Sequence, residues 1–177
     1  MELSYEGLWN AVQKGEGLEG TIEFFPEEGK YHYDGHRKCG VCLSPWEAEK
    51  YNGICPVCGK KLTMGVDHRI LQLSDRDEDT AAMPESGRPY ESLVPLPEVI
   101  SACVGKSPAA KTVTGEYEKM LQKFGPEFAI LRKVPIADIE RENGTRIASG
   151  IQRLRDGKVI CTPGFDGEYG KIRLFEE

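Results

Sequence analysis

Four of the six cysteines lie in one short stretch, and their spacing is typical of a metal site. Cys39 and Cys42 form one C-x2-C pair, and Cys55 and Cys58 form a second pair after a gap of twelve residues. Four thiolates at about 2.3 Å satisfy a tetrahedral Zn2+ ion and leave no open position for water or substrate. The spacing therefore predicts one closed, structural Zn2+ site, whose binding energy helps to fold a segment with little apolar content.

The other two cysteines and the overall composition point away from a secreted or membrane protein. Cys103 and Cys161 lie in apolar surroundings, where buried core cysteines are the expected role. The N-terminus lacks the basic start and apolar middle of a signal peptide, and no run of about 18 apolar residues predicts a membrane span. Paired C-x2-C motifs without a secretion signal favour an intracellular metal site over disulfides, so we expect a cytoplasmic protein.

A second group of polar residues precedes the cysteines. His32, Asp34 and His36 alternate along YHYDGHR, and on a strand this alternation places all three on one face. Such a face could bind a second metal ion, so one hypothesis is a self-sufficient metallohydrolase. The alternatives are a contact with an interface or an anion, polar residues at the end of a strand, or support for the zinc ligands.

The metal region is the locally basic part of an acidic chain. The whole chain has a net charge of −6, whereas residues 30–69 carry seven Lys or Arg and four acids. This distribution favours an anionic partner, although a solvated charged face explains it equally well. The candidate DNA contacts are Tyr31, Tyr33, His36, Arg37, Lys38, Lys60, Lys61 and Arg69, with Trp46 as a further aromatic candidate for stacking.

The elements around the cysteines predict a zinc-ribbon-like module over residues 37–70. Gly59 suits the positive φ of a C-x2-C turn, and Gly40 gives the first turn a permissive position. Between the two turns, SPWE has the Ser-Pro-x-Glu pattern of a capping box and predicts the start of a short helix. A further helix is predicted over 66–74.

The remaining elements predict an α+β protein with three further segments. Residues 1–36 form a helix–strand remnant of a preceding domain, with a helix over 5–14, a strand over 21–25, a turn over 26–30 and extended structure over 31–33. Residues 71–92 are a linker or mobile loop. Residues 93–177 are a C-terminal α+β domain with short helices over 97–103, 115–123, 135–142 and 145–155, an ambiguous stretch over 126–134, and a terminal hairpin of 158–162 with 171–175.

Three stretches carry a family resemblance. GTIEFFPEEGKYHYDGHRKC with the two cysteine pairs, RPYESLVPLPEVI, and GKVICTPGFDGEYGKIRLF resemble the endonuclease Q family of DNA-repair nucleases. The resemblance implies a protein that nicks DNA on the 5′ side of deaminated bases or abasic sites. It also implies an N-terminal polymerase-and-histidinol-phosphatase (PHP) domain that holds the catalytic metals, followed by a zinc module and a C-terminal domain.

This chain departs from that family in its catalytic motifs. The His-x-His and Ser-Asp-x-His motifs of the PHP domain do not occur, because position 34 is Asp and the stretch from Ser74 to Asp77 has no histidine. We therefore expect the chain to begin just past the catalytic metal ligands and not to cleave DNA alone. Catalytic divalent metals are expected only with a PHP domain, in cis or in trans.

The predicted function is the zinc-containing, DNA-contacting and lesion-recognising portion of such a repair endonuclease. It would grip the duplex and help to present an extruded base. The alternative is a structural or protein-interaction zinc module with no affinity for DNA. The sequence does not indicate the preferred lesion or the oligomeric state.

Overall fold

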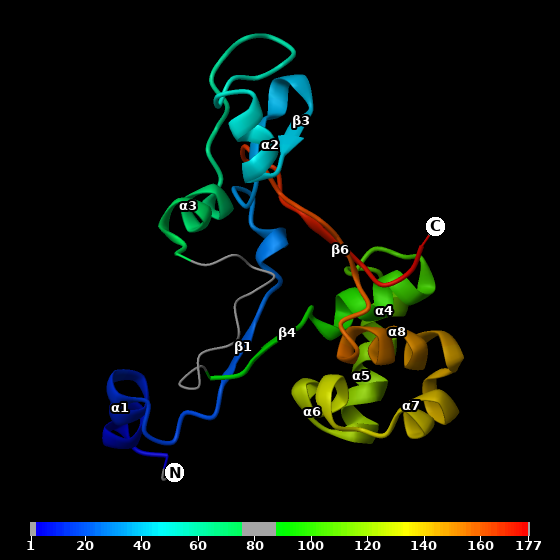
Figure 1. Ribbon diagram of the computed structural model, residues 1–177. Helices are drawn as coiled ribbons and strands as arrows, with labels where there is room; N and C mark the ends of the chain where they lie inside the picture. The colour runs from blue at the N-terminus through cyan, green and yellow to red at the C-terminus, as the bar shows by residue number, and fades with distance from the viewer. Residues whose placement is uncertain (1–2, 76–87, 177) are drawn as a thin grey trace. The chain divides into compact units, whose positions relative to one another are not determined.

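The computed structural model describes residues 3–75 and 88–176 (Figure 1). It combines helices with short two-stranded sheets, which confirms the predicted α+β class. The described residues form two compact units, one made by 3–23 with 88–92 and the other by 24–75 with 93–176. Most of the predicted linker lies outside the described residues, and the predicted domain boundaries stay a prediction. Within the described ranges, no helix combines the length and apolar composition that crossing a membrane requires.

The first unit contains one helix and one parallel strand pair. Helix α1 (Tyr5–Lys14) begins where the Ser4 side chain accepts a hydrogen bond from the Gly7 N–H, and it ends at Gly15 with a left-handed φ of 73°. Ser4 is therefore the N-cap of this helix. Strands β1 (Thr21–Glu23) and β4 (Tyr90–Ser92) pair in parallel, so the predicted strand is two residues shorter than expected.

The metal module is built on a short antiparallel pair in the second unit. Strand β2 (Asp34–His36) leads through the 3-10 turn η2 (Arg37–Cys39) into β3 (Val41–Leu43). Helix α2 (Pro45–Lys50) then starts with the predicted capping box, and helix α3 (Val66–Leu73) follows the second cysteine pair. Both helices were predicted from the sequence.

The segment before β2 differs from the prediction. The predicted turn at PEEGK is the 3-10 turn η1 (Pro26–Glu28), but of the predicted extended residues 31–33 only Tyr33 is in a β-bridge, with Phe165. At Tyr31 and His32 the chain turns again, because the His32 N–H donates to the Gly29 carbonyl at 2.9 Å. The expectation of extended structure at these two residues was wrong, since the β-favouring residue types do not reveal this local turn bond.

Five helices and the C-terminal hairpin contribute most of the side chains of the hydrophobic core. The helices are α4 (Leu96–Val104), α5 (Lys111–Phe124), α6 (Glu127–Arg132), α7 (Ile136–Asn143) and α8 (Thr145–Arg155). Helix α5 begins four residues before its predicted start, because its N-cap residue has no capping side chain to mark it. The largest fully buried apolar side chains are Leu96, Val99, Ile100, Val113, Met120, Ile130, Leu131, Ile139 and Ile151.

One arginine completes the end of α6. The Arg155 guanidinium donates to the carbonyls of Leu131, Ile130 and Val134 at 2.7–2.8 Å. These carbonyls lie in or just beyond the last turn of α6, where a helix leaves carbonyls without intrahelical partners. The side chain therefore ties α8 to the end of α6.

The last two strands form the predicted hairpin, β5 (Ile160–Thr162) with β6 (Lys171–Arg173). At its tip, Phe165 and Glu168 exchange two backbone hydrogen bonds at 3.0 and 2.8 Å. Between them, Asp166 and Gly167 have φ values of 43° and 90°. Two consecutive positive φ angles at Asp-Gly are typical of a type I′ turn, so the tip is a tight, rigid turn.

Candidate metal centre

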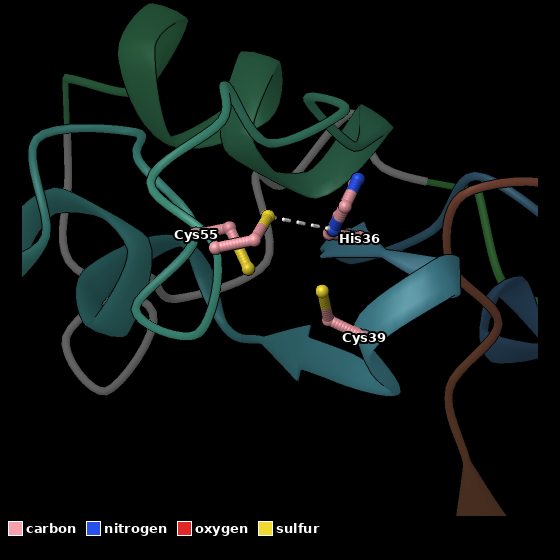
Figure 2. A group of neighbouring side chains, drawn as sticks. His36, Cys39 and Cys55 are labelled. Atoms are coloured by element: carbon pink, nitrogen blue, oxygen red, sulfur yellow. Dashed lines mark hydrogen bonds between the residues drawn. The ribbon is translucent and has the colours of Figure 1, made fainter.

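Four side chains converge in the metal module: His36, Cys39, Cys55 and Cys58. One ligand atom from each lies within 4.8 Å of the other three, and Figure 2 shows His36, Cys39 and Cys55 pointing toward one another. The Cys58 Sγ and the His36 Nδ1 are 3.5 Å apart. In a tetrahedral zinc site, this sulfur–nitrogen separation is about 3.6 Å. The group can therefore hold a metal ion, and three thiolates with one imidazole suit Zn2+.

The two halves of this group repeat one backbone pattern. Each half is a ligand, two residues, a second ligand and a glycine with positive φ: Gly40 has φ 63° and Gly59 has φ 70°. His36 pairs with Val41 five residues later, and the Cys55 N–H donates to the Lys60 carbonyl, also five residues later. HRKCG is thus the structural equivalent of CPVCG. When His36 with Cys39 is taken as the first pair and Cys55 with Cys58 as the second, 15 residues separate the two pairs. This gap is within the usual range for zinc sites with two ligand pairs.

Cys42 is the predicted ligand that lies outside the group. It sits on β3 opposite Gly35, half-buried, while His36 takes the fourth position. Burial is the largest cause that raises the pKa of the Cys42 thiol, and the carboxylates of Glu47 and Asp34 add to it. The sequence feature that could have identified His36 as a member of the group is the glycine after Cys39. The positive φ after the second ligand of such a turn favours glycine, and no glycine follows Cys42.

The thiols of the group are chemically unequal. Desolvation is the largest cause that raises the pKa of Cys39 to about 11, and the neighbouring Cys58 and Cys55 thiols add to it. Desolvation also acts on Cys55, but the backbone N–H groups of Cys58 and Val57 point at its sulfur and lower its pKa overall. A coordinated cation favours the thiolate form of every ligand. A bound cation would therefore stabilise the thiolate form of these residues, and it would offset the unfavourable effect of placing the thiols close together.

The predicted set of His32, Asp34 and His36 does not form a site. The Asp34 carboxylate is buried, accepting from the Gly65 N–H and contacting the His68 Nδ1, each at 2.5 Å. The His32 ring stacks on Tyr33, and His36 faces the cysteines. The three side chains have three different sets of partners. The Asp34–His68 contact, which sequence spacing did not indicate, ties β2 to α3 beside the metal group.

The tip of the C-terminal hairpin is fastened to the module. The Asp166 carboxylate accepts from the Arg37 N–H and from the Thr63 hydroxyl, both at 2.6 Å. The Thr63 hydroxyl and the Arg37 N–H lower the pKa of Asp166. Sequence reasoning did not predict this contact, because Asp166 is 129 residues from Arg37. It places the exposed residues of the tip next to the first ligand pair.

Four of the eight predicted DNA-contact residues are exposed cations that lie in or directly after the two turns of the metal group. Arg37 and Lys38 lie between the ligands of the first turn, and Lys60 and Lys61 directly follow the second turn; all four are exposed. Each of these four cations is within three residues of a member of the metal group along the chain, and the ligand atoms of both turns converge.

The other four members of the predicted set are less uniform. Tyr31 is exposed, and Arg69 is exposed on α3, where it donates to Gln72. Tyr33 is half-buried and its N–H donates to the Gly164 carbonyl at 2.9 Å. His36 belongs to the metal group. Its predicted contact with DNA stays a prediction, but its ring nitrogen already faces Cys58.

Comparison with known proteins identifies relatives of this arrangement. Residues 95–158, which contain α4 to α8, match the family model of the MJ0043 C-terminal domain. The protein MJ0043 of Methanocaldococcus jannaschii is 36% identical over 147 residues, which are 83% of this chain and 18% of MJ0043. The protein YqxK of Bacillus subtilis is 32% identical over 149 residues, which are 84% of this chain and 34% of YqxK. The chain therefore spans a minor part of each relative.

Two solved structures match almost the whole chain. The lesion-specific endonuclease PfuEndoQ from Pyrococcus furiosus is 32% identical with a TM-score of 0.83, covering 99% of this chain and 43% of that chain. Endonuclease Q in complex with a 27-mer duplex substrate with an abasic lesion at the active site is 32% identical with a TM-score of 0.81, covering 99% and 44%. The resemblance predicted from the sequence is thereby confirmed: in sequence and in fold, this chain corresponds to a C-terminal part of the endonuclease Q family.

Proposed function

We propose that this chain is the zinc-containing, DNA-contacting portion of a repair endonuclease similar to endonuclease Q. The observation that carries the proposal is that four exposed cations lie in or directly beside the two turns of the metal group. Arg37 and Lys38 project from one turn, and Lys60 and Lys61 follow the other. Cations on a rigid metal-bound scaffold are suited to phosphate contacts, which fix the register of a protein on a duplex.

In this proposal the metal is structural. His36, Cys39, Cys55 and Cys58 would hold one Zn2+ with every coordination position filled, so the ion would stabilise the two turns and activate no water. Hydrolysis of the phosphodiester would be the task of a PHP domain, in cis or in trans, with its own divalent metals. The role of this chain would be to grip damaged DNA and to help present a deaminated or abasic site.

Two solved relatives support damaged DNA as the partner, and charge supports DNA in general. A solved relative that covers 99% of this chain is a complex with a duplex that carries an abasic lesion. The other solved relative is named a lesion-specific endonuclease. Electrostatic attraction also requires a cationic surface, and the module supplies one in a chain whose net charge is −6.

The test is fluorescence anisotropy of labelled duplexes with the zinc-loaded chain. One duplex contains a single deoxyuridine, one an abasic site and one only thymidine, each at two salt concentrations. Tighter binding of either lesion duplex supports lesion recognition. Equal and salt-sensitive binding reduces the role to a phosphate grip.

A matched pair of variants locates the binding surface. Lys60→Gln with Lys61→Gln removes two cations beside the metal group, whereas Lys133→Gln with Lys106→Gln removes two exposed cations of the helical part. The first pair should weaken binding and flatten its salt dependence, with a slope change of about 0.9 per lost phosphate contact. Absence of binding to all three duplexes by the parent protein contradicts the proposal.

A second candidate function is docking of a protein partner, and one observation favours it. Helix α3 buries His68 on one side but exposes Val66, Ile70 and Leu73 at the i, i+4, i+7 spacing of a single apolar stripe. A pull-down with an isolated PHP domain of a relative would test this role. Retention that Ile70→Lys abolishes would support docking, and no retention would contradict it.

A further inference from the structure

One lysine ammonium lies close to two exposed tyrosine rings beside the tip of the hairpin. The Lys30 ammonium lies 5.6 Å from the centre of the Tyr31 ring and 5.7 Å from the centre of the Tyr169 ring. Tyr169 is 73% exposed and Tyr31 is 44% exposed. A tyrosine that serves only packing buries most of its ring, so these two rings are available for another contact.

The backbone beneath both rings is fixed even though the rings are exposed. The Gly167 N–H donates to the Lys30 carbonyl at 2.8 Å, and the Gly170 N–H donates to the Glu28 carbonyl at 3.1 Å. A Cβ atom at Gly170 would lie 1.9 Å from the Glu27 carbonyl oxygen, so only glycine permits this approach. These contacts hold residues 28–31 and 167–170 side by side. The two aromatic side chains are therefore presented from a rigid support, which lowers the entropic cost of binding.

A second cation completes the cluster. A Cβ atom built on Gly167 would lie 3.5 Å from the Arg37 Nη1 and 3.7 Å from the Tyr31 hydroxyl, so the guanidinium and the ring flank the same turn. The Asp166 carboxylate is engaged by the Arg37 N–H and by Thr63. Lys30 and Arg37 are exposed, and Glu168 is the exposed acid of the turn.

We propose that Tyr31, Tyr169, Lys30 and Arg37 form a stacking site for an unpaired nucleobase and its flanking phosphates. This inference rests on the proposed function and assigns it a specific site. Every nucleobase has an aromatic face, so stacking on tyrosine is tolerant of sequence, while the cations follow the backbone. A base would take over the contact that the Lys30 ammonium makes with the rings, and the ammonium would turn to a phosphate. The site suits single-stranded DNA or the strand opened at a lesion, rather than intact duplex.

The test uses the zinc-loaded chain and an oligothymidine with one central 2-aminopurine, whose fluorescence is quenched on stacking. Tyr169→Leu and Tyr31→Leu remove a ring, and Tyr169→Phe keeps one. Tyr90→Leu is the matched control, because Tyr90 is 63% exposed in the other compact unit. Anisotropy gives the Kd, and thermal unfolding verifies that each variant is folded.

We expect each Leu variant to raise the Kd for the single strand by about 5- to 150-fold, the range for loss of one stacked base, and to lose the quenching. Tyr169→Phe and Tyr90→Leu should match the parent protein in both readouts. Lys30→Gln should keep the quenching and lower the salt slope by about 0.7.

Two results overturn the inference, and they are distinguishable. If the parent binds DNA but Tyr169→Leu and Tyr31→Leu behave as Tyr90→Leu does, the stacking site is wrong and the proposed function stands. If the parent binds neither the lesion duplexes nor the single strand, both the site and the proposed function are wrong.

Discussion

The fourth member of the candidate metal group differs from the one that the cysteine spacing predicts. His36, and not Cys42, completes the group with Cys39, Cys55 and Cys58, because the glycine with positive φ follows Cys39. We expect Cys42→Ser to retain one Zn2+ per chain after dialysis, measured by elemental analysis. His36→Ala should lose most of the metal, and His36→Cys should retain it by providing a fourth thiolate. Loss of metal in Cys42→Ser together with its retention in His36→Ala would show that the ligand set is wrong.

A contact between elements gives the second prediction, at the hairpin tip. The pKa of Asp166 is lowered in the folded state by the Thr63 hydroxyl and the Arg37 N–H. A group with a depressed folded pKa contributes stability that is fully present above its ordinary value of 3.8 and is lost as the pH falls through the folded pKa. Asp166→Asn keeps a residue that tolerates positive φ but removes the charge.

The measurement is urea unfolding of the parent protein and of Asp166→Asn across a pH series. We expect the parent to be more stable at neutral pH and the difference to shrink as the pH falls below 3.8. A difference that does not change with pH would mean that the carboxylate charge contributes nothing to the docking of the hairpin.

At the scale of the whole molecule, the candidate metal group and the apolar core lie in different regions. The apolar core cluster comes from residues 93–174, whereas the module buries mainly Pro45, Ala48, Cys55 and the Asp34–His68 pair. Removal of the metal with a chelator should therefore unfold the module, including α2, and leave helices α4 to α8 intact. Hydrogen exchange checks this: amides of 34–63 should lose protection, while amides of α4 and α8 keep theirs. Simultaneous loss of protection in both regions would contradict this division.

The sequence predicted the elements better than it predicted the contacts. Helices α1, α2, α3, α7 and α8 and the terminal hairpin were predicted from capping residues, periodicity and turn residues, all of which act within a few positions. The predicted extended structure was wrong at Tyr31 and His32, where a turn bond overrides the residue preference, while Tyr33 does form a β-bridge. The His36 ligand required comparison of HRKCG with CPVCG. Asp166 and His68 could not be predicted, because their partners are more than 30 residues away in the chain.

The fastening of the hairpin tip also has a consequence for the order of events during synthesis. Arg37 and Thr63 precede Asp166 by 129 and 103 residues. A ribosome adds about 5–20 residues per second, so Asp166 is made roughly 5–26 s after these partners. All four metal ligands are present within that interval. We therefore expect the nascent chain to take up the proposed ion first, before the hairpin closes on the module.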